Sequence, residues 1–300
     1  MWIYHVERHA LNTHDIAKTM NSELLYLTNT SVAAEFEWAT YACYVYPRII
    51  QQMISCYQSS HQYVYAYNMS LWCSGYAQTI PLTSLRRSNK HKYKQYNSCF
   101  STLLQTIYRD AVSGWLMLAS FFYMVKQYDK ALHILVYSLS KFTPEKLYSF
   151  MEMSDIHNRL LKLKSFQKKK IVRIWKIMLV DYMKFYQNSW LIPHELQMEV
   201  KYTNFSISSI VYAYFLQFLC HHHRNEFRQC QDCLHTLKLV IAEHYCIEGQ
   251  ITFKSAAYNI LVIALQLSGD HEAARQAFIH SVDIFPNENT SIKRLELMSS

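Results

Sequence analysis

The chain has 300 residues, carries a formal net charge of +8 and holds only 4 Gly and 5 Pro, where average usage gives roughly 21 and 15. Its glycines stand too far apart for a dinucleotide fingerprint, a P-loop, a kinase Gly-rich loop or a nucleophile elbow, which each need paired glycines. With 51% hydrophobic and 17% charged residues, the sequence is typical of a globular protein, and its mild basicity permits an acidic partner without requiring one.

Residues 1–57 are predicted to form an N-terminal helical segment. Apolar side chains recur at helical spacing from Ile16 to Leu27. Ser31 suits the N-cap of a second helix that stops at Pro47, and a third helix is expected over residues 49–57.

Residues 58–97 are predicted to form an irregular, basic and Tyr-rich connection, partly disordered. Helical periodicity fades here, and the stretch contains Gly75, Pro81 and the basic tract Arg86–Lys94. We interpret that tract as a solvated face. A nucleic-acid surface would be better supported if this tract shared a face with the second basic tract described below.

Residues 98–300 are predicted to be almost continuously helical. Apolar residues recur at three- and four-residue spacing, and strand alternation is not sustained. Helical stretches joined by short breaks indicate antiparallel helix pairs and an all-α fold. The breaks fall near Lys126, Phe142, residues 187–193, Asn225, Gly249, Gly269 and Pro286.

An internal repeat is visible in this helical part. In the unit of residues 255–287, Tyr258 and Leu261 lie on one helix, Gly269 ends it, and Ala274 and Phe278 line the next helix. A small residue between large ones lets two helices approach closely, and glycine permits the turn.

This unit resembles the tetratricopeptide repeat, with Tyr258 where Trp is usual. A second match begins at Trp115, where Lys126 replaces the turn glycine, and a weaker third begins near Tyr214 and turns near Asn225. The resemblance implies a tetratricopeptide-like α-solenoid with irregular helices between its units.

Three further sequence segments resemble the C-terminal helical portion of Mab-type (male-abnormal) proteins, which are relatives of cyclic GMP–AMP synthase. These segments are Ala111–Phe121, Leu191–Val200 and Phe218–His223. Such proteins carry a nucleotidyltransferase core ahead of their helical part. Its Gly-Ser turn and acidic pair are not matched, because Glu35 and Glu37 have no Gly-Ser before them. The resemblance therefore implies the helical portion without the catalytic half, or a chain whose gene extends upstream of Met1.

Two clusters contain metal-ligating residue types. Cys220–His223 precedes Cys230 and Cys233, but consecutive histidines on a helix point in different directions, so we expect core thiols and an exposed helix end. His5 and His9 have helical i, i+4 spacing without an evident third ligand. We expect no metal, no cofactor and no catalytic residue.

A basic amphipathic stretch runs from Arg159 to Lys176 without an acidic residue. It is either a solvated outer face with snorkelling lysines or a surface for an acidic partner such as nucleic acid. The candidate contact residues are Arg159, Lys162, Lys168, Lys169, Lys170, Arg173 and Lys176.

The sequence thus predicts a non-enzymatic protein–protein interaction module that binds a protein or peptide in a helical groove. The alternative is the helical part of a nucleotidyltransferase-fold receptor that contacts nucleic acid through the basic helix. The most apolar runs, of 15 and 14 residues at 111–125 and 207–220, are too short to span a membrane. Met1–His9 lacks an apolar signal core, so we expect a cytoplasmic protein with free thiols.

Overall fold

The computed structural model describes residues 59–284 except 83–88, 108, 149–153, 168–170, 202 and 244–250. The helices predicted within residues 1–57 lie outside this part. The described residues are mostly helical, which confirms the all-α expectation. The elements are α3 Ser59–Thr79, α4 Asn89–Leu104, α5 Ser113–Met124, α6 Tyr128–Leu139, β1 Leu147–Tyr148, α7 Asp155–Lys162, α8 Lys164–Gln167, α9 Ile171–Met178, β2 Leu179–Val180, β3 Met183–Phe185, η2 His194–Leu196, β4 Phe205–Ile207, α10 Ser209–His223, α11 Phe227–Ala242, α12 Ile251–Leu267 and α13 His271–Ile284.

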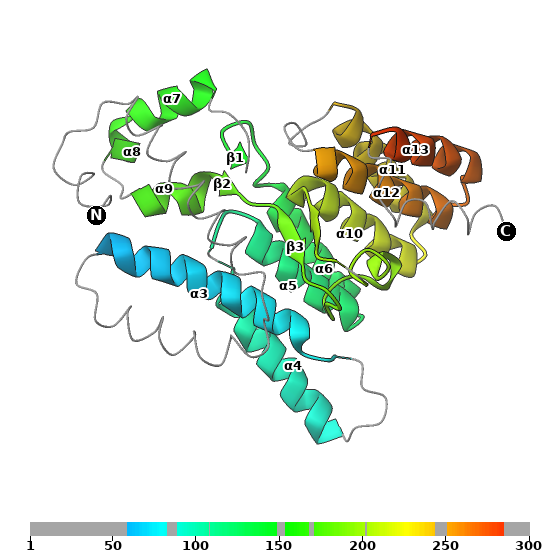
Figure 1. Ribbon diagram of the computed structural model, residues 1–300, viewed down its shortest axis with the longest axis horizontal. Helices are drawn as coiled ribbons and strands as arrows, with labels where there is room; N and C mark the ends of the chain where they lie inside the picture. Colours follow the sequence, from blue (N-terminus) through cyan, green and yellow to red (C-terminus); the bar gives the residue numbers. More distant parts are fainter. Residues whose placement is uncertain are drawn as a thin grey trace.

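Eight of these helices form pairs that follow one another through the molecule: α3 with α4, α5 with α6, α10 with α11, and α12 with α13 (Figure 1). In the last three pairs, the first helix packs on the pair before it. Helix α5 contacts α4, α10 contacts α5 and α6, and α12 contacts α10 and α11. The start of α5 lies close to the turn that follows α4, because a Cβ at Gly114 would lie 2.3 Å from the carbonyl oxygen of Thr106.

The last three pairs share one turn geometry. Lys126, Asn225 and Gly269 each adopt a left-handed backbone, with φ of 62°, 59° and 82°. The amide after each of them donates to a carbonyl five residues back, which satisfies an orphan carbonyl of the first helix. These bonds join Gln127 N to Phe122 O at 2.8 Å, Glu226 N to His221 O at 3.0 Å and Asp270 N to Leu265 O at 3.0 Å. The predicted breaks at these three positions are confirmed.

Positions counted from the turn carry the same kinds of side chain in all three pairs. At equal distance before the turn stand Trp115, Tyr214 and Tyr258, each partly buried against the core. After the turn come a small buried residue (Ala131, Cys230, Ala274) and then a large buried one (Leu135, Leu234, Phe278). The pairs are therefore packed alike, as the sequence spacing predicted.

Residues 140–208 form an insert between the second and third of these four pairs, and they correct the expectation of continuous helix. Strands β1 and β2 pair in parallel, and β3 pairs antiparallel with β4 so that Met183 faces Ile207 and Phe185 faces Phe205. These four side chains are buried, whereas Lys184 and Ser206 between them are half-buried. Strands of two or three residues are too short to show an alternating pattern in the sequence.

The β3–β4 segment lies across the first helices of all four pairs. On α3, the Gln78 amide donates to Lys184 O at 3.1 Å and accepts from Tyr186 N at 2.9 Å. On α10 the Tyr212 ring lies 5.2 Å from Phe185, and strands β3 and β4 contact α5 and α12 respectively. The β3–β4 segment therefore covers the side of the four pairs on which their first helices lie.

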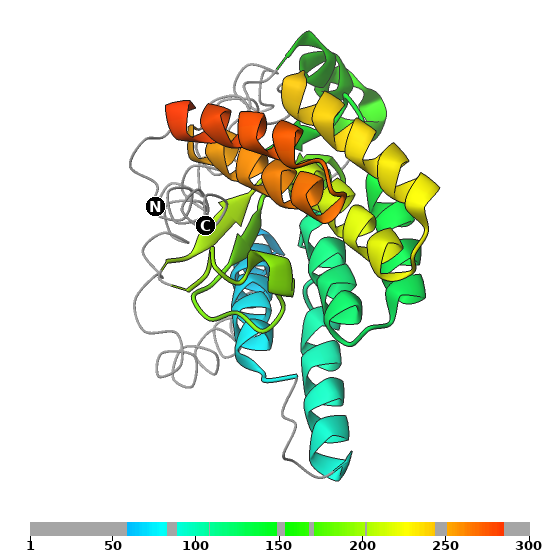
Figure 2. The same ribbon diagram turned by 90° about the vertical axis from the view of Figure 1, so that its right-hand side faces the viewer.

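The expectation of an irregular connection over residues 58–97 is wrong for its described part, which contains the whole of α3 and the first half of α4 (Figure 2). Tertiary contacts outweigh the weak local signal, because Cys73 and Ala77 of α3 and Cys99 and Leu103 of α4 are buried. Helix α4 also crosses the predicted domain boundary at residue 97.

We predict that Lys126→Gly raises the free energy of unfolding by about 0.5–1 kcal/mol, because a left-handed backbone costs less for glycine than for lysine. Gly269→Ala should lower it by about 1 kcal/mol through backbone strain alone, since nothing lies within 4 Å of the added methyl group. Urea denaturation measures both. Lys130→Gly, inside α6, is the control and should destabilise; equal losses for Lys126→Gly and Lys130→Gly would contradict the turn geometry.

Candidate functional site

A polar cluster forms where α5 and α10 end and η2 passes over them. The Tyr123 hydroxyl donates to Glu195 Oε1 at 2.9 Å, and His223 Nε2 lies 2.9 Å from the same hydroxyl oxygen. Because a phenol has one proton and it goes to Glu195, His223 Nε2 carries the proton of the second bond. The Tyr128 ring stacks on His223 at 5.2 Å with 7° between the planes.

Burial, followed by the charge and hydrogen bond of Glu195, raises the pKa of Tyr123 far above its ordinary value. The phenol therefore stays protonated and acts as a donor that fixes Glu195. Beside it, His221 pairs with Glu226, and Arg224 pairs with Glu226 and with Asp129 of α6. These contacts join η2 to two helix pairs, and we interpret the cluster as structural.

The cysteines of the predicted Cys/His cluster lie in the core. Cys220, Cys230 and Cys233 are buried free thiols, as expected for a helix pair's inner face. The neighbouring histidines point in different directions, because His221 contacts Glu226 while His223 contacts Tyr123. Among the described residues, no three His, Cys, Asp or Glu side chains form a group suited to a metal ion. His5 and His9 lie outside the described residues.

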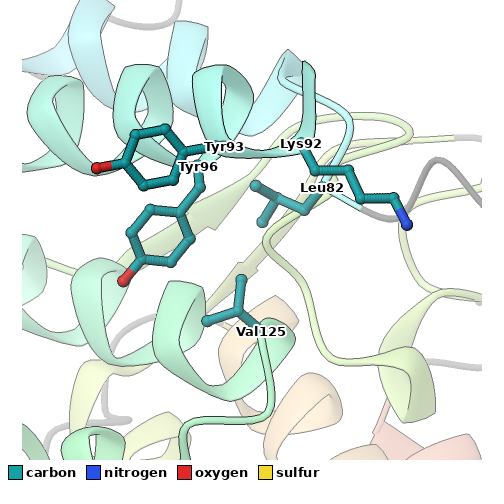
Figure 3. Close-up of a pocket in the computed structure, with 5 residues that line it drawn as sticks. All are labelled: Leu82, Lys92, Tyr93, Tyr96 and Val125. Atoms are coloured by element: carbon teal, nitrogen blue, oxygen red, sulfur yellow. The ribbon is translucent and has the colours of Figure 1, made fainter. Parts of the chain in front are cut away.

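A pocket of about 280 Å³ lies between the first half of α4 and the end of α5 (Figure 3). Its lining is aromatic and aliphatic except for one ammonium group at the edge: Leu82, Lys92, Tyr93, Tyr96 and Val125. We call it the α4 pocket. The pocket was not predicted from the sequence, because residues 58–97 were expected to be irregular; the i, i+3 spacing of Tyr93 and Tyr96 was the available signal.

The described candidate contact residues of the Arg159–Lys176 stretch lie on α7 and α9, where Arg159, Lys162, Arg173 and Lys176 are exposed. Lys168, Lys169 and Lys170 lie outside the described residues. Both views place α7 and α9 at one end of the molecule and the start of α4, with Lys90, Lys92 and Lys94, at the other (Figures 1 and 2). The described basic residues of the two tracts, Lys90, Lys92 and Lys94 on α4 and those on α7 and α9, therefore do not share one face.

Comparison with protein-family models, with curated proteins and with solved structures finds no match to this chain. Within the described ranges, no helix has both the length and the apolar character that a membrane span requires.

We predict that Tyr123→Phe lowers the free energy of unfolding by about 1–2 kcal/mol, because it removes the donor to Glu195 and the acceptor of His223 inside a part-buried cluster. Tyr137→Phe is the matched control, since Tyr137 is 44% exposed, and should change stability by less than about 0.5 kcal/mol. Urea denaturation measures both; equal effects would contradict the assignment of the cluster as a structural tie.

Alkaline pH should destabilise the fold through its buried thiols. Burial raises the pKa of Cys99 and of Cys233 to about 12, whereas an unfolded thiol titrates near about 8.5. Above that value only the unfolded state releases the protons, so each thiol lowers the unfolding free energy by ~1.4 kcal/mol per pH unit. Urea denaturation between pH 7 and 10 in reductant measures this slope.

The double variant Cys99→Ala with Cys233→Ala should show a shallower slope than the native chain. An unchanged slope would mean that other groups carry the alkaline loss.

Proposed function

We propose that this chain is a non-enzymatic helical-repeat protein that binds other proteins, with its helix pairs arranged as an irregular tetratricopeptide-like solenoid. The observation that supports it is the common build of the last three pairs: one turn geometry, one small residue after the turn, and a first helix packed on the pair before. Stacked pairs of this kind present extended surfaces to partners. The buried free thiols support the cytoplasmic location that the sequence predicts.

The partner surface that we propose is the outward face of the second helices, because the β3–β4 segment covers the first ones. On α6, Val136 and Tyr137 are 61% and 44% exposed, and on α11 Phe227 and Leu239 are 76% and 45% exposed. Apolar side chains at these positions add little to the core and are available to a protein partner.

The second candidate function is contact with nucleic acid through α7 and α9, in line with the resemblance to receptors of nucleotidyltransferase fold. The supporting observation is that Arg159, Lys162, Arg173 and Lys176 are all exposed at one end of the molecule. Phosphate contacts of this kind weaken steeply as salt rises.

The test is an affinity purification from extracts of the source cells, with and without nuclease, at low and raised salt. We expect a protein partner near equal molar amounts that survives nuclease and raised salt. The variant Val136→Ser with Phe227→Ser should release it, because both changed side chains are exposed and the fold does not depend on them.

Two outcomes would contradict the interaction proposal. Retention of nucleic acid alone, lost at raised salt and in the variant Arg159→Glu with Lys162→Glu, would favour the second candidate. A partner retained equally by the native chain and by the Val136/Phe227 variant would exclude the outward face of α6 and α11.

A further inference from the structure

The first half of α4 is positively charged and has no acidic neighbour along the chain. Lys90, Lys92 and Lys94 are exposed there, and no Asp or Glu occurs anywhere from residue 38 to residue 109. Ion pairs within the hairpin of α3 and α4 are therefore impossible, and the lysines repel one another across the surface.

The direction of α4 adds to this positive potential. A helix carries partial positive charge at its N-terminus, where carboxylates stabilise it and cations oppose it. The first turn of α4 holds Lys90, His91 and Lys92 and no acidic residue. A bound carboxylate would relieve both the repulsion among the lysines and their conflict with the helix dipole.

The α4 pocket supplies an apolar counterpart at the same place. Tyr96 forms a fixed wall, because its ring packs 5.0 Å from the buried Phe121 and 6.2 Å from Phe100. In Figure 3 Val125 lies below the two tyrosines and Leu82 lies between them and Lys92, whereas Tyr93 is 68% exposed. A volume of about 280 Å³ lies just under the range of small-molecule sites and suits a single inserted side chain.

The lysines flank this pocket. Lys92 lines it directly (Figure 3). Lys90 precedes Tyr93 by three residues, so helical geometry places it next to Tyr93. An apolar pocket is thus flanked by two lysines of one helix, Lys90 and Lys92.

We propose that the α4 pocket binds an acidic segment of a partner protein. One aliphatic or aromatic side chain of that segment enters between Tyr93, Tyr96 and Val125, and its neighbouring carboxylates contact Lys90 and Lys92. The site is separate from the outward face of α6 and α11, so its test is independent of the affinity purification described above.

The aromatic geometry favours a peptide over single-stranded nucleic acid. Stacking of successive bases needs rings with open faces. The Tyr96 ring is packed against Phe121 and Phe100, which leaves Tyr93 as the exposed ring of the pocket.

The experiment is a fluorescence anisotropy titration of the purified full chain with a labelled short peptide of Glu and Ser that has one central Phe. We expect saturable binding at low salt. Replacing the central Phe by Ser should weaken binding about tenfold through loss of the buried side chain. Tyr93→Ser should do the same, and Lys90→Glu with Lys92→Glu should weaken binding at least about tenfold.

Matched changes far from the site serve as controls. Ile279→Ser removes an exposed apolar side chain of α13, and Lys238→Glu reverses an exposed charge of α11; both should leave the affinity unchanged. Circular dichroism should show native helix content for Tyr93→Ser, whose side chain is largely exposed.

The proposal is overturned if the native chain does not bind the peptide, or if the Phe-free peptide binds as well. It is equally overturned if a thymidine oligonucleotide binds more tightly and loses its affinity in the Lys90/Lys92 variant, since α4 would then be a nucleic-acid surface.

Discussion

The burial of the β3–β4 segment against the first helices is the contact on which the remaining packing depends. Helices α5 and α10 are apolar almost all round, with eleven of twelve residues of α5 buried. A helix of this kind must be covered on every side. Helices α6 and α11 cover one side and the preceding pair another, so the insert supplies the cover that is still needed.

Placing irregular backbone in a core requires partners for its polar groups. Asp110 accepts hydrogen bonds from the amides of Ser113 and Asp181, which ties the start of α5 to the chain just before β3. Arg109 pairs with Asp181, whose carbonyl accepts a bond from the Ser209 hydroxyl at the start of α10. On α3, the Gln78 side chain donates to the Lys184 carbonyl and accepts from the Tyr186 amide. These bonds hold the insert in one register against the first three helix pairs.

The sequence predicted the parts that repeat and missed those that depend on distant contacts. Gly269, Ala274 and Phe278 define a turn and a helix interface by local spacing, and the same spacing located the pairs that turn at Lys126 and Asn225. Helix α4 has weak local propensity and forms on the buried Cys99 and Leu103. Strands β3 and β4 lie about twenty residues apart and are too short to show a period, so their pairing could not be predicted. The α4 pocket was missed because residues 58–97 were expected to be irregular.

The position of the β3–β4 segment affects which surfaces of the helix pairs stay exposed. The β3–β4 segment occupies the side of the pairs on which their first helices lie. Exposed apolar side chains such as Val136 and Phe227 lie instead on second helices. Helix α4 is the second helix of the pair that it forms with α3. Its cations oppose its own dipole at a cost of about 0.3–1 kcal/mol each, and burial of its apolar residues offsets that cost. The unrelieved charge is therefore retained in the free protein, where it favours an anionic partner.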